Sequence, residues 1–485
     1  METDLTTLMP WLILSSGILL TLLGSVIRVE SRRPAQLLAV LTLVATAASA
    51  LAGIGAEPSA PFGGVIEISA LSKAVLVLMC ALGTAFAVGT GPYLTRERIH
   101  ISDYYHLLLI LILGGSVLVC SKDLVVSFIA LEVMSLPAYT LTGFRRNDPR
   151  SNEAAIKYFI LGGAIGAVFL LGTSFVFGAT GTTKLSAIYE WSKLSTSADP
   201  LFVTGHALIL FSFLFKAAAV PFHFWKPDVY EGAPVPVTGV MATVVTSAAF
   251  VFLLRMVHLV DVSREAWAAY GEHLRLGIRV TAVASLVTGS VVLVTQKNLK
   301  RMMAYSAITH TGYLLMGLLG TLGAGEPVLS VLVYLFGYSI MTSGVFVLLS
   351  LSATPADGGV ELVDLTGLMK KAPFQTVLWS VFLFSMAGMP FTVGFFTKYS
   401  VFVSSMAQGE VVLAVIAGLC AVVSAYAYLR PLALMVMREP DPAAATWGSE
   451  ISSQMIAVCA AAAVVLLGIL PNPMLHYLKG ILLIH

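Results

Sequence analysis

The chain has 485 residues, of which 58% are hydrophobic and 11% are charged, and its formal net charge is +2. A soluble globular protein carries about 25% charged residues, so this chain has too little polar surface to face water on all sides. The composition predicts an all-α, polytopic membrane protein. The basic residues lie in short clusters between apolar runs, so no nucleic-acid-binding patch is indicated.

The motifs of common cofactor sites are absent from the sequence. Cys80, Cys120, Cys420 and Cys459 are far apart, with no CxxC or Cys/His spacing typical of zinc, iron–sulfur or haem sites. No glycine-rich phosphate loop follows a predicted strand. We therefore expect no metal and no redox centre on this chain. The first residues lack the basic region of a cleaved signal peptide, so residues 8–27 are predicted to be a retained span.

Runs of about 20 mostly apolar residues, the length that a membrane-spanning helix needs, recur along the whole chain. Lys and Arg in the odd-numbered loops outnumber those in the even-numbered loops by about two to one, which predicts cytoplasmic odd loops and outer termini. We predict fourteen spans, near 8–27, 35–54, 71–92, 103–120, 123–143, 155–179, 202–225, 236–259, 275–296, 300–321, 327–352, 374–403, 409–437 and 454–475.

Two of these spans carry a matching interruption. In FKAAAVPFHFW, residues 215–225, Lys216 is followed by the helix breaker Pro221, and in SMAGMPFTVGFFTKY, residues 385–399, Pro390 is followed by Lys398. A mid-helix proline frees a backbone carbonyl that hydrocarbon cannot satisfy. Interrupted helices at matching places in two halves of a transporter indicate its ion site.

The distance between the two prolines predicts an internal repeat. They are 169 residues apart (390 − 221), which relates spans 4–8 to spans 9–13. Because each copy has five helices, the second would enter the membrane from the opposite face, as an inverted repeat does. The predicted parts are a three-span segment (1–100), a first five-helix unit (101–260), a second (270–440) and a C-terminal helix (450–485).

Three ionisable side chains are predicted inside spans, where a charge is costly and usually functional. Glu132 lies in the middle of span 5, Lys216 in span 7 and Lys398 in span 12. A carboxylate beside a buried lysine offsets the desolvation of both groups, and a change in their separation lets the lysine load and release a proton. The alternative is a static ion pair that only fixes helix register.

Further polar groups lie in and near these spans. Span 10 places Tyr305 and His310 on nearby turns, and a histidine passes protons through either ring nitrogen near neutral pH. His310 is either a proton relay or a hydrogen-bonded packing residue. His223 either lines the interruption at Pro221 or lies at the membrane interface, where we also place His206. Asp123 is predicted to cap span 5 rather than to form a site, and Lys226 is predicted to lie in a cytoplasmic loop.

Four segments of the sequence are distinctive: IALEVMSLPAYTLTGF, FKAAAVPFHFWKPDVYEGAPVPV, NLKRMMAYSAITHTGYLLMG and SMAGMPFTVGFFTKY. They resemble the subunit N family of bacterial NADH:quinone oxidoreductase, respiratory complex I. The resemblance covers residues 70–440, and its wider group includes Mrp-type cation/proton antiporters and membrane hydrogenase subunits. It implies a fourteen-helix antiporter-like subunit with one proton channel, in which Glu132, Lys216, His310 and Lys398 form the proton pathway.

One position departs from that family. Where helix 8 usually has a lysine, this sequence has Thr246. The path is then expected to pass through water bridged by Thr243, Thr246 and Ser247, or to depend more on His310.

The resemblance implies a translocase subunit in the bacterial inner membrane that assembles with other membrane-arm subunits. NADH, FMN, the iron–sulfur clusters and quinone would be bound by partner subunits, and this chain would bind no cofactor. Two alternatives stay open at this point: an Mrp-type Na⁺/H⁺ antiporter or related hydrogenase subunit, and a subunit that only anchors the membrane arm.

Overall fold

The computed structural model describes residues 5–26, 32–97, 99, 101–322, 327–353, 360–440 and 446–483. Its described part is almost entirely helical, and two short strands, β1 (Ser352–Ala353) and β2 (Thr446–Trp447), pair antiparallel. The helices are α1 (Leu5–Val26), α2 (Arg32–Ala52), α3 (Ala70–Gly89), α4 (Gly91–Arg96), α5 (Ile101–Cys120), α6 (Leu124–Thr142), α7 (Pro149–Thr180), α8 (Leu185–Leu194), α9 (Pro200–Lys216), α10 (Trp225–Gly232), α11 (Val235–Val240), α12 (Thr246–Val257), α13 (Glu265–Thr295), α14 (Leu299–Gly320), α15 (Pro327–Leu349), α16 (Leu368–Lys371), α17 (Pro373–Ala387), α18 (Val393–Ala407), α19 (Val411–Met437), α20 (Ile451–Ile469) and α21 (Asn472–Leu483).

The predicted all-α membrane class is confirmed, and each of the fourteen predicted ranges coincides with a helix or a pair of helices. Eleven helices of the described residues are long and apolar enough to cross a membrane as single elements. Both predicted interruptions are present: α9 and α10 share span 7, and α17 and α18 share span 12. The count of fourteen spans stays a prediction, as do the boundaries of the four parts, some of which lie outside the described residues.

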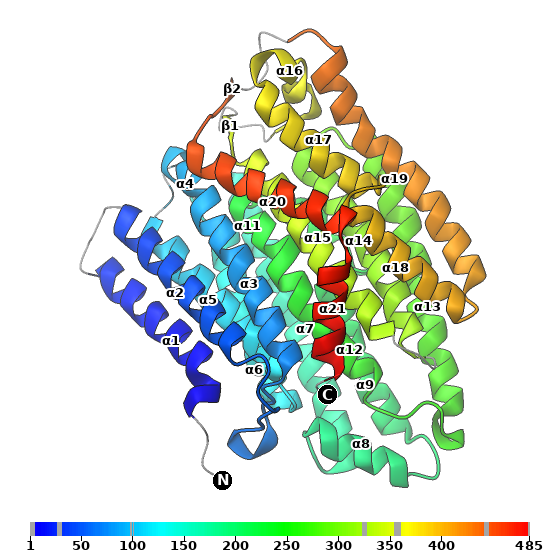
Figure 1. Ribbon diagram of the computed structural model, residues 1–485. Coiled ribbons are helices and arrows are strands. Elements are labelled where there is room, and N and C mark those ends of the chain that lie inside the picture. The colour runs from blue at the N-terminus through cyan, green and yellow to red at the C-terminus, as the bar shows by residue number, and fades with distance from the viewer. Residues whose placement is uncertain are drawn as a thin grey trace.

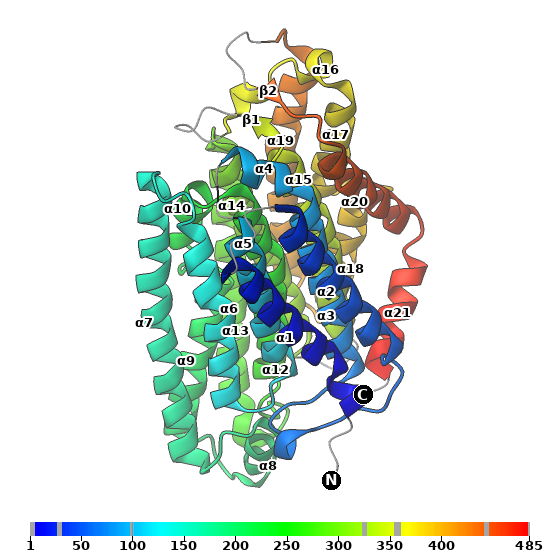
Figure 2. The same cartoon turned by 90° about the vertical axis from the view of Figure 1, so that its left-hand side faces the viewer.

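The centre of the bundle is formed by the segment Val235–Val257 and by α15. The apolar window of the first is 100% buried and that of the second is 89% buried, whereas α1 and α20 bury 22% of theirs. The long helices run side by side with α1 and α2 at one edge and α13 and α19 at the other (Figure 1). A quarter turn shows α7 on the outside of the bundle, away from α20 and α21 (Figure 2). The central helices are therefore shielded from lipid by their neighbours.

Side-chain acceptors fix where several helices begin. Asp123 accepts the backbone N–H groups of Val125 and Val126, which confirms its predicted role as the cap of α6. Asn298 accepts two backbone N–H groups at the start of α14 in the same way. Such caps satisfy backbone donors that the first helical turn leaves without partners.

The backbone around these two caps follows one pattern twice. Residues 122–124 pair with 183–185 near α8, and residues 297–299 pair with 360–362 before α16, each through two backbone hydrogen bonds. Figure 1 shows α8 and α16 at opposite ends of the bundle. This arrangement supports the inverted repeat, which stays a prediction.

The crossing of α7 and α9 depends on two glycines that face each other. A Cβ on Gly172 would lie 2.7 Å from the Gly205 carbonyl oxygen, and a Cβ on Gly205 would lie 2.7 Å from that of Gly172. Small residues at such crossings let membrane helices approach closely. Because α9 ends at Lys216, this crossing also positions the first interruption.

We predict that Gly172→Ala lowers the stability of the protein by about 1–3 kcal/mol, because the added methyl group forces α7 and α9 apart. The midpoint of thermal unfolding in detergent measures the effect. Gly163→Ala on the same helix is the matched control, because a Cβ there meets nothing within 4 Å. Equal midpoints for the two variants would contradict the prediction.

Candidate functional site

The first interruption separates Lys216, the last residue of α9, from Trp225, the first residue of α10. Its backbone includes a cis peptide bond before Pro221 and a positive φ of 56° at Ala218. Because the helical hydrogen-bond ladder of α9 ends at Lys216, the backbone groups of this segment need other partners.

Neighbouring helices supply those partners. Trp225 Nε1 donates to the Phe215 carbonyl oxygen at 3.1 Å, and this bond holds the start of α10 against the end of α9. Thr311 Oγ1 of α14 donates to the Ala217 carbonyl oxygen at 2.9 Å. Ser285 Oγ of α13 accepts the Val220 N–H at 2.9 Å. The interruption is therefore a defined structure that three helices stabilise.

The second interruption lies between Ala387 at the end of α17 and Val393 at the start of α18. Gly388 has a φ of +88°, and a Cβ there would lie 3.1 Å from Lys398 Cδ. Glycine both permits this turn and makes room for the lysine. Lys398 Nζ donates to the carbonyl oxygens of Met386 at 2.8 Å and Ala387 at 3.0 Å, and a cation is favourable at a helix C-terminus.

Lys216 lies in an aromatic pocket and is only 7% exposed. Its ammonium group donates to Ser135 Oγ at 2.7 Å. It also lies 5.3 Å from the ring centroid of Tyr139 and 5.1 Å from that of Tyr158, distances at which cation–π attraction operates. A hydroxyl and two ring faces thus stabilise the charge that burial would otherwise make costly.

The predicted pairing of Glu132 with Lys216 is indirect. Glu132 is half-buried on α6, one turn from Ser135, and a Cβ on Gly166 of α7 would lie 2.9 Å from its Oε1 atom. The two charges act on each other, but the ion pairs of the described residues, counted to 4.0 Å, do not join them. The ammonium group instead bonds Ser135, which lies on the same helix face as Glu132.

His310 lies in a cluster of tyrosines at the centre of the protein. Its Nδ1 atom is 2.6 Å from the Tyr334 hydroxyl, and its ring centroid is 4.7 Å from that of Tyr338. Tyr313 stacks on Tyr334 and lies 5.6 Å from Lys398 Nζ. The positive charge of Lys398 also acts on the imidazole of His310. The structure therefore brings His310 and Lys398 into one aromatic environment.

The three hydroxyls predicted to bridge helix 8 are buried and already bonded within the protein. Thr243 Oγ1 donates to Gly239 and Thr246 Oγ1 to Met241, both along their own helix, while Ser247 Oγ lies 3.2 Å from Ser339 Oγ. A π-helical turn at Met241–Val245 precedes Thr246, and such turns often occur at functional sites.

Other predicted site residues lie at the edges of this arrangement. His223 and Tyr305 are half-buried, and His223 lies within the first interruption. Pro221 and Pro390 are exposed on the surface of the chain. The freed backbone groups bond inward to other helices while the prolines themselves face outward.

His206 is completely buried within the described protein, with Nε2 at 2.9 Å from the Met256 carbonyl oxygen and Nδ1 at 2.6 Å from the Tyr270 hydroxyl. Its place at the membrane interface stays a prediction. One prediction about a single residue is wrong. Lys226 does not lie in a loop: it belongs to α10 and is 2% exposed. The sequence signal for Lys226 was its place directly after a broken helix, where the chain turns back into the bundle.

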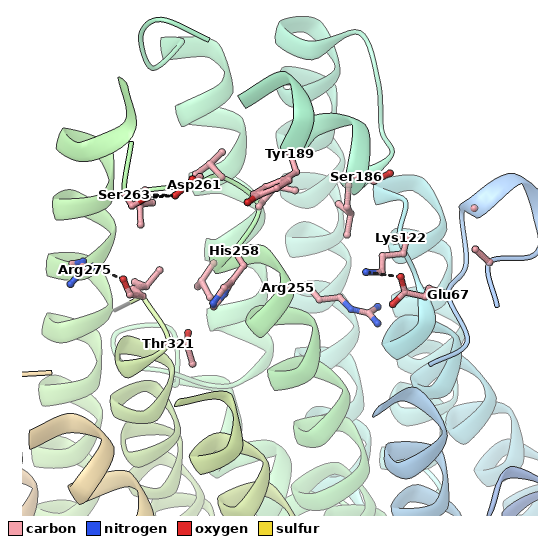
Figure 3. Close-up of a pocket in the computed structure, with 18 residues that line it drawn as sticks. Glu67, Lys122, Ser186, Tyr189, Arg255, His258, Asp261, Ser263, Arg275 and Thr321 are labelled. Carbon is pink, nitrogen blue, oxygen red and sulfur yellow. Dashed lines mark hydrogen bonds and ion pairs between the residues drawn. The ribbon is translucent and has the colours of Figure 1, made fainter. Parts of the chain in front are cut away.

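A pocket with a volume of about 880 Å³ lies at the α8 end of the bundle. Figure 3 shows Arg255 and His258 of the α12 end facing it, with the Lys122–Glu67 ion pair (3.0 Å) at its side. None of the predicted site residues lines it. Within the described ranges, no group of three His, Cys, Asp or Glu side chains is placed to hold a metal ion.

The family model described as NADH:quinone oxidoreductase/Mrp antiporter, TM, matches residues 121–424, which contain both interruptions. The chain therefore belongs to this family of antiporter-like membrane subunits, which confirms the resemblance seen in the sequence. Curated relatives within the family include N subunits. It is 39% identical to NADH-quinone oxidoreductase subunit N 1 of Sorangium cellulosum over 83% of this chain and 81% of the relative. It is 33% identical to subunit N of Myxococcus xanthus over 98% and 97%.

Solved structures agree in fold. A chain of respiratory complex I from Thermus thermophilus superposes with a TM-score of 0.81 at 30% identity, covering 96% of this chain and 98% of that one. A chain of the Mrp complex from Dietzia gives a TM-score of 0.85 at 19% identity, covering 99% and 97%. The second likeness, at this low identity, shows the shared fold alone.

We predict that Thr311→Val destabilises the protein by about 1–3 kcal/mol, because the Ala217 carbonyl group loses its donor in a buried place. Valine keeps the shape of threonine, so packing is unchanged. Thr309→Val on the same helix is the control, because its hydroxyl bonds only to Tyr305 of its own helix. Thermal unfolding in detergent compares the two variants, and the prediction fails if they unfold together.

Proposed function

We propose that this chain is a proton-translocating membrane subunit of a complex I-type NADH:quinone oxidoreductase. The observation that carries the proposal is the placement of Lys216 and Lys398 at the two helix interruptions, with His310 between them in an aromatic interior. A subunit that only anchors a membrane arm has no need of three buried ionisable groups, because burying each of them costs free energy.

In the proposed path, a proton moves from Lys216 past His310 to Lys398. Movement of Glu132 toward or away from Lys216 changes how strongly the ammonium group keeps its proton. Ser135 is the hydrogen-bond partner that Lys216 would exchange when Glu132 approaches. Lys398 ends the path. Its ammonium group, which is bonded to the carbonyl oxygens at the end of α17, gives up the proton there.

Redox chemistry is assigned to partner subunits in this proposal. NADH, FMN, the iron–sulfur clusters and quinone would be bound there, and this chain would contribute no redox centre and no cofactor site. Its partners would be other membrane-arm subunits, including antiporter-like paralogues and small membrane subunits. We place it in the bacterial inner membrane with both termini on the outer side, as the distribution of Lys and Arg predicts.

We predict that Lys216→Ala in the assembled complex abolishes or reduces proton pumping coupled to NADH oxidation, because the first proton-holding group is lost. The measurement is the proton yield per NADH oxidised in inverted membrane vesicles. The control is Lys193→Ala, which removes an exposed lysine paired with Glu190 on α8. An unchanged proton yield in an intact complex would overturn the proposal.

We predict a loss of the same kind for Glu132→Gln, which keeps the shape of the side chain and removes only its charge. The complex should assemble in normal amount, because Glu132 has no ion-pair partner among the described residues to lose. Normal pumping in this variant would restrict the path to the lysines and His310.

The antiporter alternative is tested separately. Vesicles that contain this chain without its redox partners should not collapse a pH gradient when Na⁺ is added. Cation-dependent collapse would favour an Mrp-type Na⁺/H⁺ antiporter, whose fold this chain shares.

A further inference from the structure

The described residues contain five buried lysines, and one of them, Lys226, lacks the hydrogen-bond acceptor that the other four have. Four ammonium groups have a hydrogen-bond acceptor inside the protein, and these are Lys73 with Gly53, Lys216 with Ser135, Lys300 with Ala233 and Glu231, and Lys398 with Met386 and Ala387. Lys226 is as buried as Lys73 and Lys300, at 2% exposure, but its ammonium group has no hydrogen bond or ion pair with a described residue. Its contact is the ring of Tyr230, at 5.4 Å from the centroid.

Packing does not account for this side chain. A methionine has a similar length and volume and would fill the same space without burying a charge. A structural lysine, such as Lys300, is instead fixed by carbonyl oxygens. Carbonyl acceptors favour the charged amine, so an ammonium group without them, such as that of Lys226, gives up its proton more readily than one that they hold.

Lys226 also lies between the Lys216 pocket and the tyrosine cluster around His310, the two parts of the proposed path. The preceding residue, Trp225, stacks on Tyr158 at 4.8 Å between centroids, and the Tyr158 ring is the one beside Lys216 Nζ. Helix α10 packs against α14, the helix of His310. The positive charge of Lys226 acts on His310 and on His223. Lys226 thus has Lys216 on one side and His310 on the other.

Polar atoms without protein partners line the same interval. The hydroxyls of Tyr158 and Tyr230 and the Nδ1 atom of His223 are buried, and none has a hydrogen-bond partner within the described protein. Buried polar atoms of this kind are usually satisfied by ordered water. Water bound to these atoms would connect the lysines over distances that a direct hydrogen bond does not span.

We propose that Lys226 is a proton carrier between Lys216 and His310, a role that rests on the proposed function. The Lys216 ammonium group gives one proton through water to the neutral amine of Lys226. The Lys226 ammonium group then gives one proton to the His310 ring nitrogen that does not bond Tyr334, and returns to the neutral amine. Thr246 cannot store a proton, because a hydroxyl bonded to its own helix has no accessible charged form.

The test measures proton yield per NADH oxidised in the assembled complex for Lys226→Met and Lys226→Arg. The methionine variant should lose as much pumping as Lys216→Ala while the amount of assembled complex is unchanged. The arginine variant should lose the same amount, because a guanidinium group stays charged and does not release its proton. Lys226→His, which restores a titratable group, should recover part of the yield.

Matched variants separate the outcomes. Lys300→Met removes an equally buried lysine that is bonded to carbonyl oxygens, so it should reduce assembly and leave the proton yield per NADH normal. Normal pumping in Lys226→Met, or recovery in Lys226→Arg, would overturn the carrier role of Lys226, the second by showing that charge alone suffices. If Lys216→Ala also pumps normally, the proposed function itself fails.

Discussion

The structure depends on one constraint, which is that an interrupted helix inside an apolar bundle must find a partner for every backbone group that the interruption frees. At the first interruption those partners are Ser285 of α13 and Thr311 of α14. Both helices belong to the second predicted five-helix unit, while the interruption belongs to the first. The same bonds that satisfy the broken helix therefore join the two units at the site. A shift of α13 or α14 would displace the backbone that follows Lys216.

The second interruption solves the same problem differently. There the freed carbonyl oxygens at the end of α17 are occupied by Lys398, so the ionisable side chain is itself the partner of the broken backbone. A proton on Lys398 stabilises the end of α17, and its loss weakens that stabilisation because a neutral amine donates weaker hydrogen bonds. The protonation state of Lys398 and the local structure of the interruption are consequently coupled, which is what a gate at the end of a proton path requires.

Much of this arrangement follows from the sequence, because its strongest signals are local. The apolar runs, the cap at Asp123, both interruptions and the buried positions of Glu132, Lys216, His310 and Lys398 depend on a residue and its immediate neighbours. The partners depend on contacts between distant helices, and these were missed. Ser135 bonds Lys216 where the sequence predicts Glu132 as the partner. The sequence assigns Lys226 to a loop because it directly follows the predicted end of span 7 at residue 225.

The environments of the lysines along the path also differ in a consistent way. Lys398 is bonded to two backbone carbonyl oxygens, Lys216 to one hydroxyl and two aromatic rings, and Lys226 contacts one ring without an acceptor. Fixed carbonyl acceptors favour the charged amine most, and ring faces favour it least. The ends of the path are thus better at keeping a proton than its middle. In the proposed path, a proton in the middle therefore moves to one of the two ends. The position of Glu132 at one end and the structure of the α17–α18 interruption at the other would decide which end receives it.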